Sequence, residues 1–234
     1  MSILNDLNFA KAATFLIPSL VSGLGVVIEA TVLGFLLAIV LGMIIAIGRL
    51  SNVKAIRGFL YIFLEIVRGT PLLVQLVYIY YVVPLLIDLA AMLLFNYSTN
   101  MQISSLTAGI LGLGINYSCY MSEVIRSSIL AIDKGQTEAA LVLGFGKYQA
   151  LFRIVIPQAI RNVIPSLGNY LVMMVKDTSL LAYVAVNELL LRTQTFASQT
   201  FLTIESYTYL AIAYLIISIP LSHLVKYIEH KMKN

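Results

Sequence analysis

Two pairs of opposite charges interrupt hydrophobic segments of this 234-residue chain. Glu65 and Arg68 are three residues apart, and so are Glu123 and Arg126. Residues at this spacing lie on one face of a helix, so each pair can form an ion pair. We interpret Glu123 and Arg126 as a structural pair. For Arg68 two roles stay open: a structural pair with Glu65 that steadies a kink beside Gly69 and Pro71, or a guanidinium that meets the carboxylate of a small substrate.

A third charged pair lies where a later hydrophobic segment is interrupted. Lys176 and Asp177 are adjacent, so they point about 100° apart on a helix and do not face each other. Thr178 and Ser179 follow them. A helix break there would expose backbone polar groups, which is tolerated in a membrane only against protein or a water-filled cavity. Broken helices often mark substrate sites, so we predict that this segment contacts a substrate.

Polar side chains also enter the hydrophobic segment around residue 116. Asn116 and Tyr120 are four apart and share a helix face, and Tyr117 lies beside them. They serve either hydrogen bonding between helices or substrate contact. The full set of candidates for a substrate path is Arg68, Thr70, Gln75, Asn116, Tyr117, Tyr120, Lys176, Asp177, Thr178 and Ser179.

The residue inventory gives little support to covalent or metal chemistry. Cys119 is the single cysteine, which excludes an internal disulfide framework and a multi-cysteine metal site. The two histidines, His223 and His230, both lie near the C-terminus, so a histidine-based metal site inside a membrane is not expected. We predict no catalytic residue, no metal and no enzymatic activity for this chain.

The composition is that of a polytopic membrane protein. Hydrophobic residues make up 60% of the chain and charged residues 11%, whereas soluble domains carry about 25% charged residues. Mean hydropathy is +0.93. The length suits one transmembrane domain over residues 1–234. No cleavage pattern of a signal peptide follows Lys11, so we expect the N-terminus to be retained.

Hydrophobic runs predict an all-α protein with five transmembrane helices, since a bilayer core needs about 20 apolar residues per helix. The clearest run is Ala30 to Gly48, which the apolar stretch from Ser19 could lengthen. We predict the second helix from about Phe59 to Ile87. The other three are Leu106 to Tyr120, Arg161 to Lys176 with a possible continuation, and Ser206 to Ser222.

Basic residues predict the orientation of these five helices. Eleven of the 15 lysines and arginines fall in three segments, 49–57, 126–161 and 226–233, which lie on one side in a five-helix arrangement. The other side has only Lys11 and Arg192. Because cytoplasmic loops carry an excess of basic residues, we predict an outside N-terminus and a cytoplasmic C-terminus.

The loop at about 133–157 is then cytoplasmic, and its pattern predicts two short helices. Gln136 to Leu143 is free of helix breakers, and Gly144 can end this helix in a left-handed conformation. Gly146 permits a second bend, Lys147 to Val155 is again helical, and Pro157 is expected to mark a boundary. Such a compact loop either docks in a groove of another protein or rests on lipid headgroups.

The same loop resembles the hallmark of ATP-binding-cassette (ABC) importer permeases, E-A-A-x3-G-x9-I-x-L-P. Ile156 stands where the family usually has leucine, and Gly146 stands where amino-acid permeases often have a serine or threonine cap. The resemblance implies a coupling helix that docks on a partner ATPase. The residues assigned to this coupling role are Glu138, Ala139, Ala140, Gly144, Lys147, Ile154 and Pro157.

Three further segments resemble the polar amino-acid uptake subfamily. They are 65–75 (EIVRGTPLLVQ), 116–126 (NYSCYMSEVIR) and 176–180 (KDTSL). The resemblance implies the fold of type I ABC importers and transport of an amino acid such as glutamine, histidine, arginine or cystine. It also implies three partners: an ATPase subunit, a second permease chain (identical or homologous) and an extracytoplasmic solute-binding protein.

The chain contains no G-x-x-x-x-G-K-[ST] sequence, so we expect ATP and magnesium to be bound by the partner ATPase. The main rival function is an ion-driven secondary transporter, whose sign would be an internal repeat; we find none. A gated channel would need a ring of matching polar residues from an oligomer, and a non-transporting scaffold would not need the charged motifs. We expect the chain in a bacterial plasma membrane as a multi-pass protein. Which amino acid is carried stays open at this level.

Overall fold

A computed structural model describes residues 7 to 233 as a helical protein, with no β-strand in that range. The succession of hydrophobic runs explains this architecture, because only helices satisfy every backbone polar group within one apolar segment. The helices are α1 (Phe9–Arg49), α2 (Lys54–Gly69), α3 (Leu72–Val77), α4 (Val83–Phe95), α5 (Ser105–Leu130), α6 (Lys134–Val142), α7 (Lys147–Ala150), α8 (Ile156–Asp177), α9 (Leu189–Thr200) and α10 (Thr203–Lys233).

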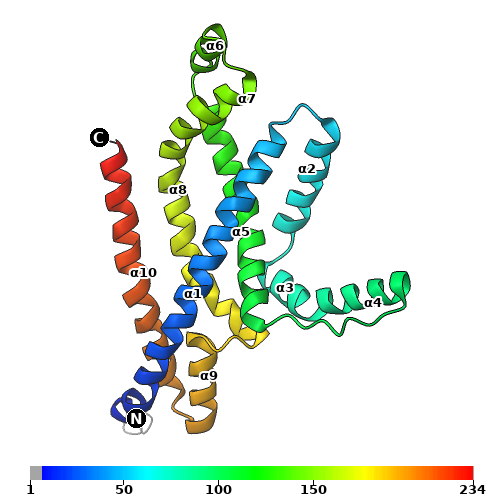
Figure 1. Cartoon of the computed structure of the whole chain (residues 1–234). Helices are drawn as coiled ribbons and strands as arrows, with labels where there is room; N and C mark the ends of the chain where they lie inside the picture. The colour runs from blue at the N-terminus through cyan, green and yellow to red at the C-terminus, as the bar shows by residue number, and fades with distance from the viewer. Residues whose placement is uncertain (1–6, 234) are drawn as a thin grey trace.

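The axes of the long helices α1, α5, α8 and α10 lie roughly along one direction, with α8 running opposite to the other three (Figure 1). α6, α7, the turn between α1 and α2, and the C-terminal end of α10 lie at one end. α9 and the first residues of α1 lie at the other. The three basic segments predicted to share one side therefore lie at the same end of the molecule, which we call the α6 end.

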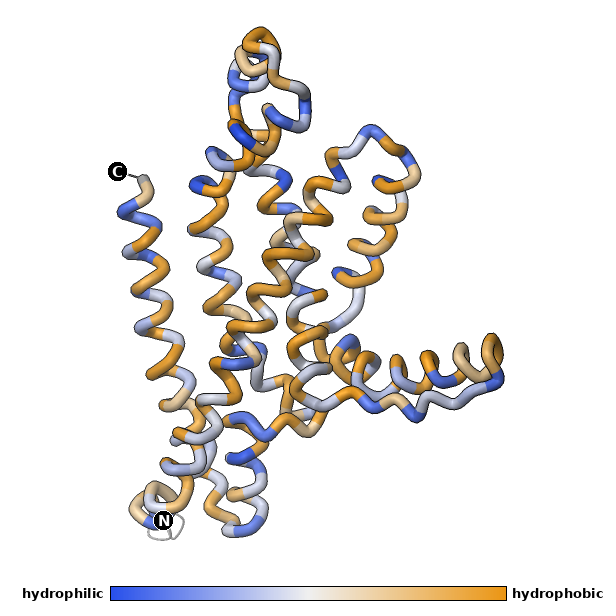
Figure 2. Tube along the Cα trace, in the orientation of Figure 1, coloured by the Kyte–Doolittle hydropathy of each residue, from blue (hydrophilic) through white to orange (hydrophobic). Residues whose placement is uncertain are grey.

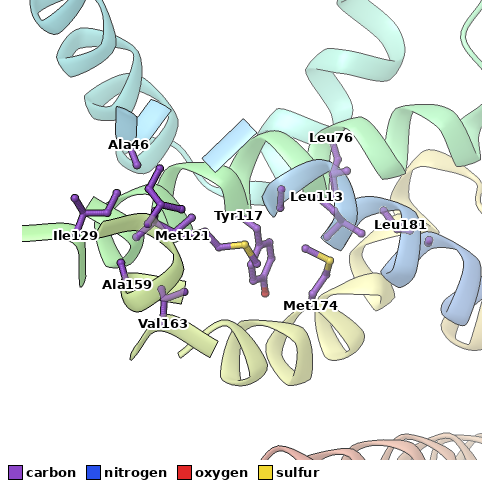
Figure 3. Packing of buried hydrophobic residues seen from close by; sticks show 14 of the residues in the cluster. Ala46, Leu76, Leu113, Tyr117, Met121, Ile129, Ala159, Val163, Met174 and Leu181 are labelled. Atoms are coloured by element: carbon purple, nitrogen blue, oxygen red, sulfur yellow. The ribbon is translucent and has the colours of Figure 1, made fainter. Parts of the chain in front are cut away.

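The core is the seam between α1, α5 and α8. α1 packs along α5 over much of its length, and α8 packs on α5 from another side. Figure 3 shows Met121 and Leu113 of α5 in this cluster with Ala46 of α1 and Met174 of α8. Small residues let α1 and α5 approach closely: a Cβ added to Gly42 would lie 3.2 Å from the Ser118 carbonyl oxygen.

Three helical segments among residues 7–233 are long and apolar enough to cross a membrane: Phe9–Arg49, Leu72–Phe95 and Thr203–Met232. Figure 2 shows hydrophobic residues along most of α1, α4 and the middle of α10. α5 and α8, with 26 and 22 residues, are also long enough, but polar residues lower their hydropathy. The structure thus contains the predicted third and fourth segments as helices.

The second predicted helix is not continuous, which corrects the expectation of one helix from Phe59 to Ile87. α2 already begins at Lys54 and ends at Gly69, and Thr70 has an extended backbone with φ −115° and ψ 142°. Pro71 explains the break, because a proline disfavours helical backbone at the preceding residue and has no N–H to donate. The chain resumes as α3 and then α4, which projects sideways from the bundle (Figure 1).

Pro157 is not a helix boundary, contrary to the expectation from sequence. α7 continues through a π-helical turn, η3 (Leu151–Val155), directly into α8. A second π-helical turn, η2 (Tyr78–Val82), precedes Pro84 at the same distance. In both turns the next N–H donates to the carbonyl five residues back. The wider turn accommodates a proline, whose ring would otherwise clash with the carbonyl four residues back.

The loop between α5 and α8 has the two-helix form that the sequence predicts. α6 ends in a Schellman motif, in which the Phe145 N–H donates to the Ala140 carbonyl and the Gly144 N–H to the Leu141 carbonyl, both at 3.0 Å. Gly144 has φ +87°, a left-handed conformation that glycine adopts without strain. α7 begins at Lys147, and Gln149 accepts a hydrogen bond from the Gly146 N–H.

We expect Gly42→Val to separate α1 from α5 and to lower the free energy of unfolding by about 1–3 kcal/mol, the usual cost of overpacking. The matched control is Gly25→Val on the same helix, because nothing lies within 4 Å of a Cβ added there. Thermal unfolding in mild detergent measures both. Equal melting temperatures for the two variants would contradict the close α1–α5 contact.

Candidate functional site

A cavity of about 450 Å³ opens where α2 ends, between α5 and α8. Its volume falls in the range of small-molecule sites. The break after Gly69 forms one wall, α5 the second and the C-terminal half of α8 the third. Its lining residues are Arg68, Gly69, Thr70, Pro71, Leu72, Asn116, Tyr117, Tyr120, Tyr170, Met173 and Asp177.

A carboxylate held by a tyrosine forms one side of this cavity. The Tyr117 hydroxyl donates to Asp177 Oδ2 at 2.7 Å, and Tyr117 is 3% exposed. The rings of Tyr117 and Tyr170 meet edge to face with centroids 6.1 Å apart, and Tyr120 lies 6.5 Å from Tyr170. The hydroxyl fixes the Asp177 carboxylate at the end of α8, where the helix gives way to the 3₁₀ turn η4 (Thr178–Val184).

Arg68 supplies the opposite charge at the α2 wall. Its Nη2 lies 3.5 Å from Glu65 Oε1, so the predicted ion pair exists, but at this distance it is a loose contact. The Arg68 side chain is 31% exposed and lines the cavity as well. The ion pair with Glu65 therefore does not keep Arg68 out of the cavity. A guanidinium and a carboxylate lining one cavity suit the carboxylate and the ammonium of a zwitterion.

Gln75 closes the helix break beside the cavity. Its Nε2 donates to the Val67 carbonyl at 2.6 Å, and to the carbonyl and hydroxyl of Thr70 at 3.0 and 2.9 Å. Its Oε1 accepts from Asn116 Nδ2 at 3.1 Å. The amide thus satisfies carbonyls freed by the break and ties α3 to α5. Because Gln75 uses its Oε1 for Asn116, the orientation of the Asn116 amide is set as well.

The structure brings six of the ten path candidates to the cavity: Arg68, Thr70, Asn116, Tyr117, Tyr120 and Asp177. Gln75 does not line the cavity but is hydrogen-bonded to Asn116, which does. Lys176 is exposed and does not line the cavity. The Thr178 hydroxyl is buried and donates to the Val175 carbonyl, and the Ser179 hydroxyl donates to the Lys176 carbonyl. In this structure both hydroxyls satisfy carbonyls at the end of α8.

Sequence reasoning missed one charge partner and five lining residues, of which Gly69, Pro71 and Leu72 lie within two residues of the candidates Arg68 and Thr70. Tyr170 and Met173 precede Asp177 by seven and four residues, so helical periodicity alone could have identified them. Arg49 could not be found in this way. It comes from the end of α1 and contacts Glu123, which also accepts from Arg126 Nη2 at 2.6 Å. The predicted pair is therefore a cluster of two arginines on one carboxylate, near the α6 end.

A second cavity, of about 480 Å³, lies under α4 and is lined by Asp88. Its carboxylate already accepts from the N–H groups of Thr99 and Asn100, at 2.6 and 3.0 Å, and from the Ser98 hydroxyl. These hydrogen bonds hold the irregular segment that connects α4 to α5, so the role of Asp88 is structural. Volume does not distinguish the two cavities, but the paired opposite charges do. Residues 7–233 contain no cluster of His, Cys, Asp and Glu suited to a metal ion.

The tip of the α6 end exposes apolar side chains. Val142 is 88% exposed, Leu143 76% and Tyr148 78%, around the left-handed Gly144. Of the residues assigned to coupling, Ala140 is buried within the loop and Ile154 is partly buried. Glu138, Ala139, Gly144, Lys147 and Pro157 are exposed. Figure 1 shows α6 beyond the ends of α5 and α8. An apolar tip that projects from the bundle is typical of an interaction surface.

Residues 38–234 match the family described as binding-protein-dependent transport system inner membrane component. The chain is 31% identical over 217 residues to the glutamine transport system permease protein GlnP of Escherichia coli (strain K12), covering 93% of this chain and 94% of that protein. It is 35% identical over 177 residues to the L-cystine transport system permease protein TcyB of Bacillus subtilis (strain 168), covering 76% and 70%.

Solved structures agree. The crystal structure of an amino acid ABC transporter with histidines matches with a TM-score of 0.81 and 32% identity, covering 96% of this chain and 99% of that one. An inward-facing structure of the MetNI methionine ABC transporter matches with a TM-score of 0.60 at 15% identity, covering 93% and 98%, which shows a shared fold.

We expect Gln75→Leu and Asn116→Leu to be coupled. Each single change leaves the partner amide without its hydrogen bond and should lower stability by about 1–2 kcal/mol, whereas the double variant should lose less than the sum. Melting temperatures of the four proteins in mild detergent give the coupling. Strictly additive losses would contradict a direct bond between the two amides.

Proposed function

We propose, because this chain belongs to the family of binding-protein-dependent transport system inner membrane components, that it carries a polar amino acid across the membrane by alternating access driven by a partner ATPase. The chain is a multi-pass membrane protein and a permease subunit of an amino-acid ABC importer. The cavity bounded by α2, α5 and α8 is the substrate site in this proposal. One observation carries it: Arg68 and Asp177 line the same cavity.

The chemistry of that cavity fits an amino acid by its two common groups. Arg68 binds the α-carboxylate, since a guanidinium offers a planar pair of donors to a carboxylate. Asp177, positioned by Tyr117, binds the α-ammonium. Tyr120, Tyr170 and Asn116 remain for the side chain of the substrate. Binding is non-covalent throughout, and the chain moves the substrate without changing it.

The exposed tip of the loop between α5 and α8 is the surface on which the ATPase docks. Two features support docking over contact with lipid headgroups. The tip lies beyond the ends of the long helices (Figure 1), and its most exposed apolar residues, Val142, Leu143 and Tyr148, flank the Schellman turn. Motion of the ATPase then reaches the cavity through α5 and α8. These two helices flank the loop and form two walls of the cavity. ATP and magnesium are held by the partner.

The arrangement of basic residues supports the orientation predicted from sequence, with the α6 end in the cytoplasm and the N-terminus outside a bacterial plasma membrane. Five spans would then be formed by α1, by α2 with α3, and by α5, α8 and α10. A second permease chain, identical or homologous, completes the pore. An extracytoplasmic binding protein delivers the amino acid at the opposite end, near α9.

Reconstitution tests the proposal as a whole. The chain is co-expressed with its genomic neighbours, purified in mild detergent and placed in liposomes. We expect an ATPase to copurify and to drive uptake of an amino acid only when ATP is supplied. Uptake that persists without ATP, from well-folded protein with no ATPase bound, would replace the proposal with an ion-driven secondary transporter.

We expect Asp177→Asn and Arg68→Ala each to raise the half-saturating amino-acid concentration for ATP-driven uptake about tenfold or more, because each removes a charge-assisted hydrogen bond. Asp88→Asn is the control: it neutralises an aspartate that lines the other cavity. Uptake assays with labelled amino acid measure all three. An unchanged half-saturating concentration in both cavity variants would remove the pair from substrate binding.

We expect Gly144→Asp to abolish ATP-driven uptake and copurification of the ATPase while membrane insertion stays intact, because the change adds a charge to the apolar tip. The control is Gly144→Asn, which has nearly the same shape, tolerates a left-handed backbone and carries no charge. Pull-down followed by mass spectrometry compares the two variants with wild type. Normal ATPase recovery with Gly144→Asp would contradict docking at this turn.

A further inference from the structure

α2 carries a stripe of polar side chains along one face. Positions 54, 57, 61, 65 and 68 recur every three or four residues, so all five side chains share a narrow sector of the helix. We call this set the α2 stripe: Lys54, Arg57, Tyr61, Glu65 and Arg68. The first four are exposed, Tyr61 at 56%, and the Arg68 side chain is 31% exposed.

Two other faces of α2 are apolar and have different surroundings. Leu64 and Val67 are buried in a cluster with Ile45 of α1 and Cys119 of α5, so they form the packed face. Ile62 and Ile66 are exposed at 60% and 62% and form a third face. Hydrocarbon chains can cover this third face without cost. They cannot cover the α2 stripe in the same way, because charged groups in lipid are strongly disfavoured.

The α2 stripe ends in the substrate cavity. Arg68 lines the cavity. From Arg68 the stripe runs along α2 to Lys54, the first residue of this helix, at the α6 end (Figure 1). α5 and α8 continue from the same cavity with polar residues at helical spacing and in the same direction. On α5 these are Asn116, Tyr120, Glu123 and Ser127, and on α8 they are Asp177, Tyr170, Ser166 and Asn162. Three helices thus carry polar faces from the cavity to one end of the molecule.

Dry packing of the α2 stripe against another protein does not fit its charges. The stripe has three basic residues and one acidic residue. In the part of the chain that the structure describes, one ion pair forms within the stripe, between Arg68 Nη2 and Glu65 Oε1 at 3.5 Å. Burying Lys54 and Arg57 without carboxylate partners would leave uncompensated charges in a low-dielectric interface. Water would satisfy all five side chains, so the charges of the stripe favour a wet environment.

We propose that the α2 stripe lines the water-filled route by which the amino acid leaves the cavity toward the α6 end. The proposal rests on the function proposed above, in which the cavity binds the substrate. Tyr61 and Glu65 form the middle of the route, two turns and one turn beyond Arg68, and the second permease chain closes it on the open side. Ile62 and Ile66, next to them in sequence, face lipid.

Cysteine accessibility separates the two faces at adjacent positions. Cys119 is the single native cysteine and is fully buried, so Cys119→Ala gives a parent without thiols. Tyr61→Cys and Ile62→Cys are added to this parent, since the native residues are similarly exposed, at 56% and 60%. The complete transporter, in liposomes without nucleotide, is treated with a charged methanethiosulfonate reagent from the α6 end. Only a thiol that meets water ionises and reacts quickly.

We expect Tyr61→Cys to react about tenfold faster than Ile62→Cys, because a thiol surrounded by lipid stays protonated and out of reach. Equal rates, or a faster reaction of Ile62→Cys, would overturn the proposal. Glu65→Cys and Ile66→Cys form a second pair with the same expectation, in case Tyr61→Cys does not fold. ATP-driven uptake by the Cys119→Ala parent tests the proposed function separately, because labelling rates do not depend on transport.

Discussion

Every backbone polar group of a chain inside a bilayer must find a partner, and this constraint explains where the helices break. α2 breaks at Thr70 and Pro71, and Gln75 donates to the carbonyl groups released there. α8 gives way to η4 at Thr178, whose hydroxyl donates to the Val175 carbonyl. The two breaks lie beside one cavity. At both breaks, side chains of the protein satisfy carbonyl groups that the helix no longer uses.

The division of helices into apolar and polar ones follows from the same constraint. α1, α10 and the segment that contains α4 are apolar enough to cross a membrane, whereas the cavity is built mainly from α5, α8 and the end of α2. Some of the polar residues that lower the hydropathy of α5 and α8, namely Asn116, Tyr117 and Asp177, line the cavity. The reduced hydropathy of α5 and α8 thus coincides with their position at the cavity.

Close packing and charge together fix α5, which leads from the cavity to the α6 end. Gly42 and its neighbours bring α1 against α5. At the α6 end, Glu123 binds Arg126 on its own helix and Arg49 on α1. These contacts hold α5 against α1 between the cavity and the α6 end.

The sequence by itself determined the class of the protein, the third and fourth hydrophobic helices, the glycine turn of the loop and most of the cavity residues. These properties depend on composition and on spacing within one helix, so local patterns reveal them. The tertiary structure alone decided that Pro71 divides a helix whereas Pro157 does not, because a π-helical turn absorbs the second proline. It also brought Arg49 to Glu123 and Tyr117 to Asp177, contacts between residues 74 and 60 positions apart. Such contacts depend on how helices pack, and no periodicity within a single helix contains that information.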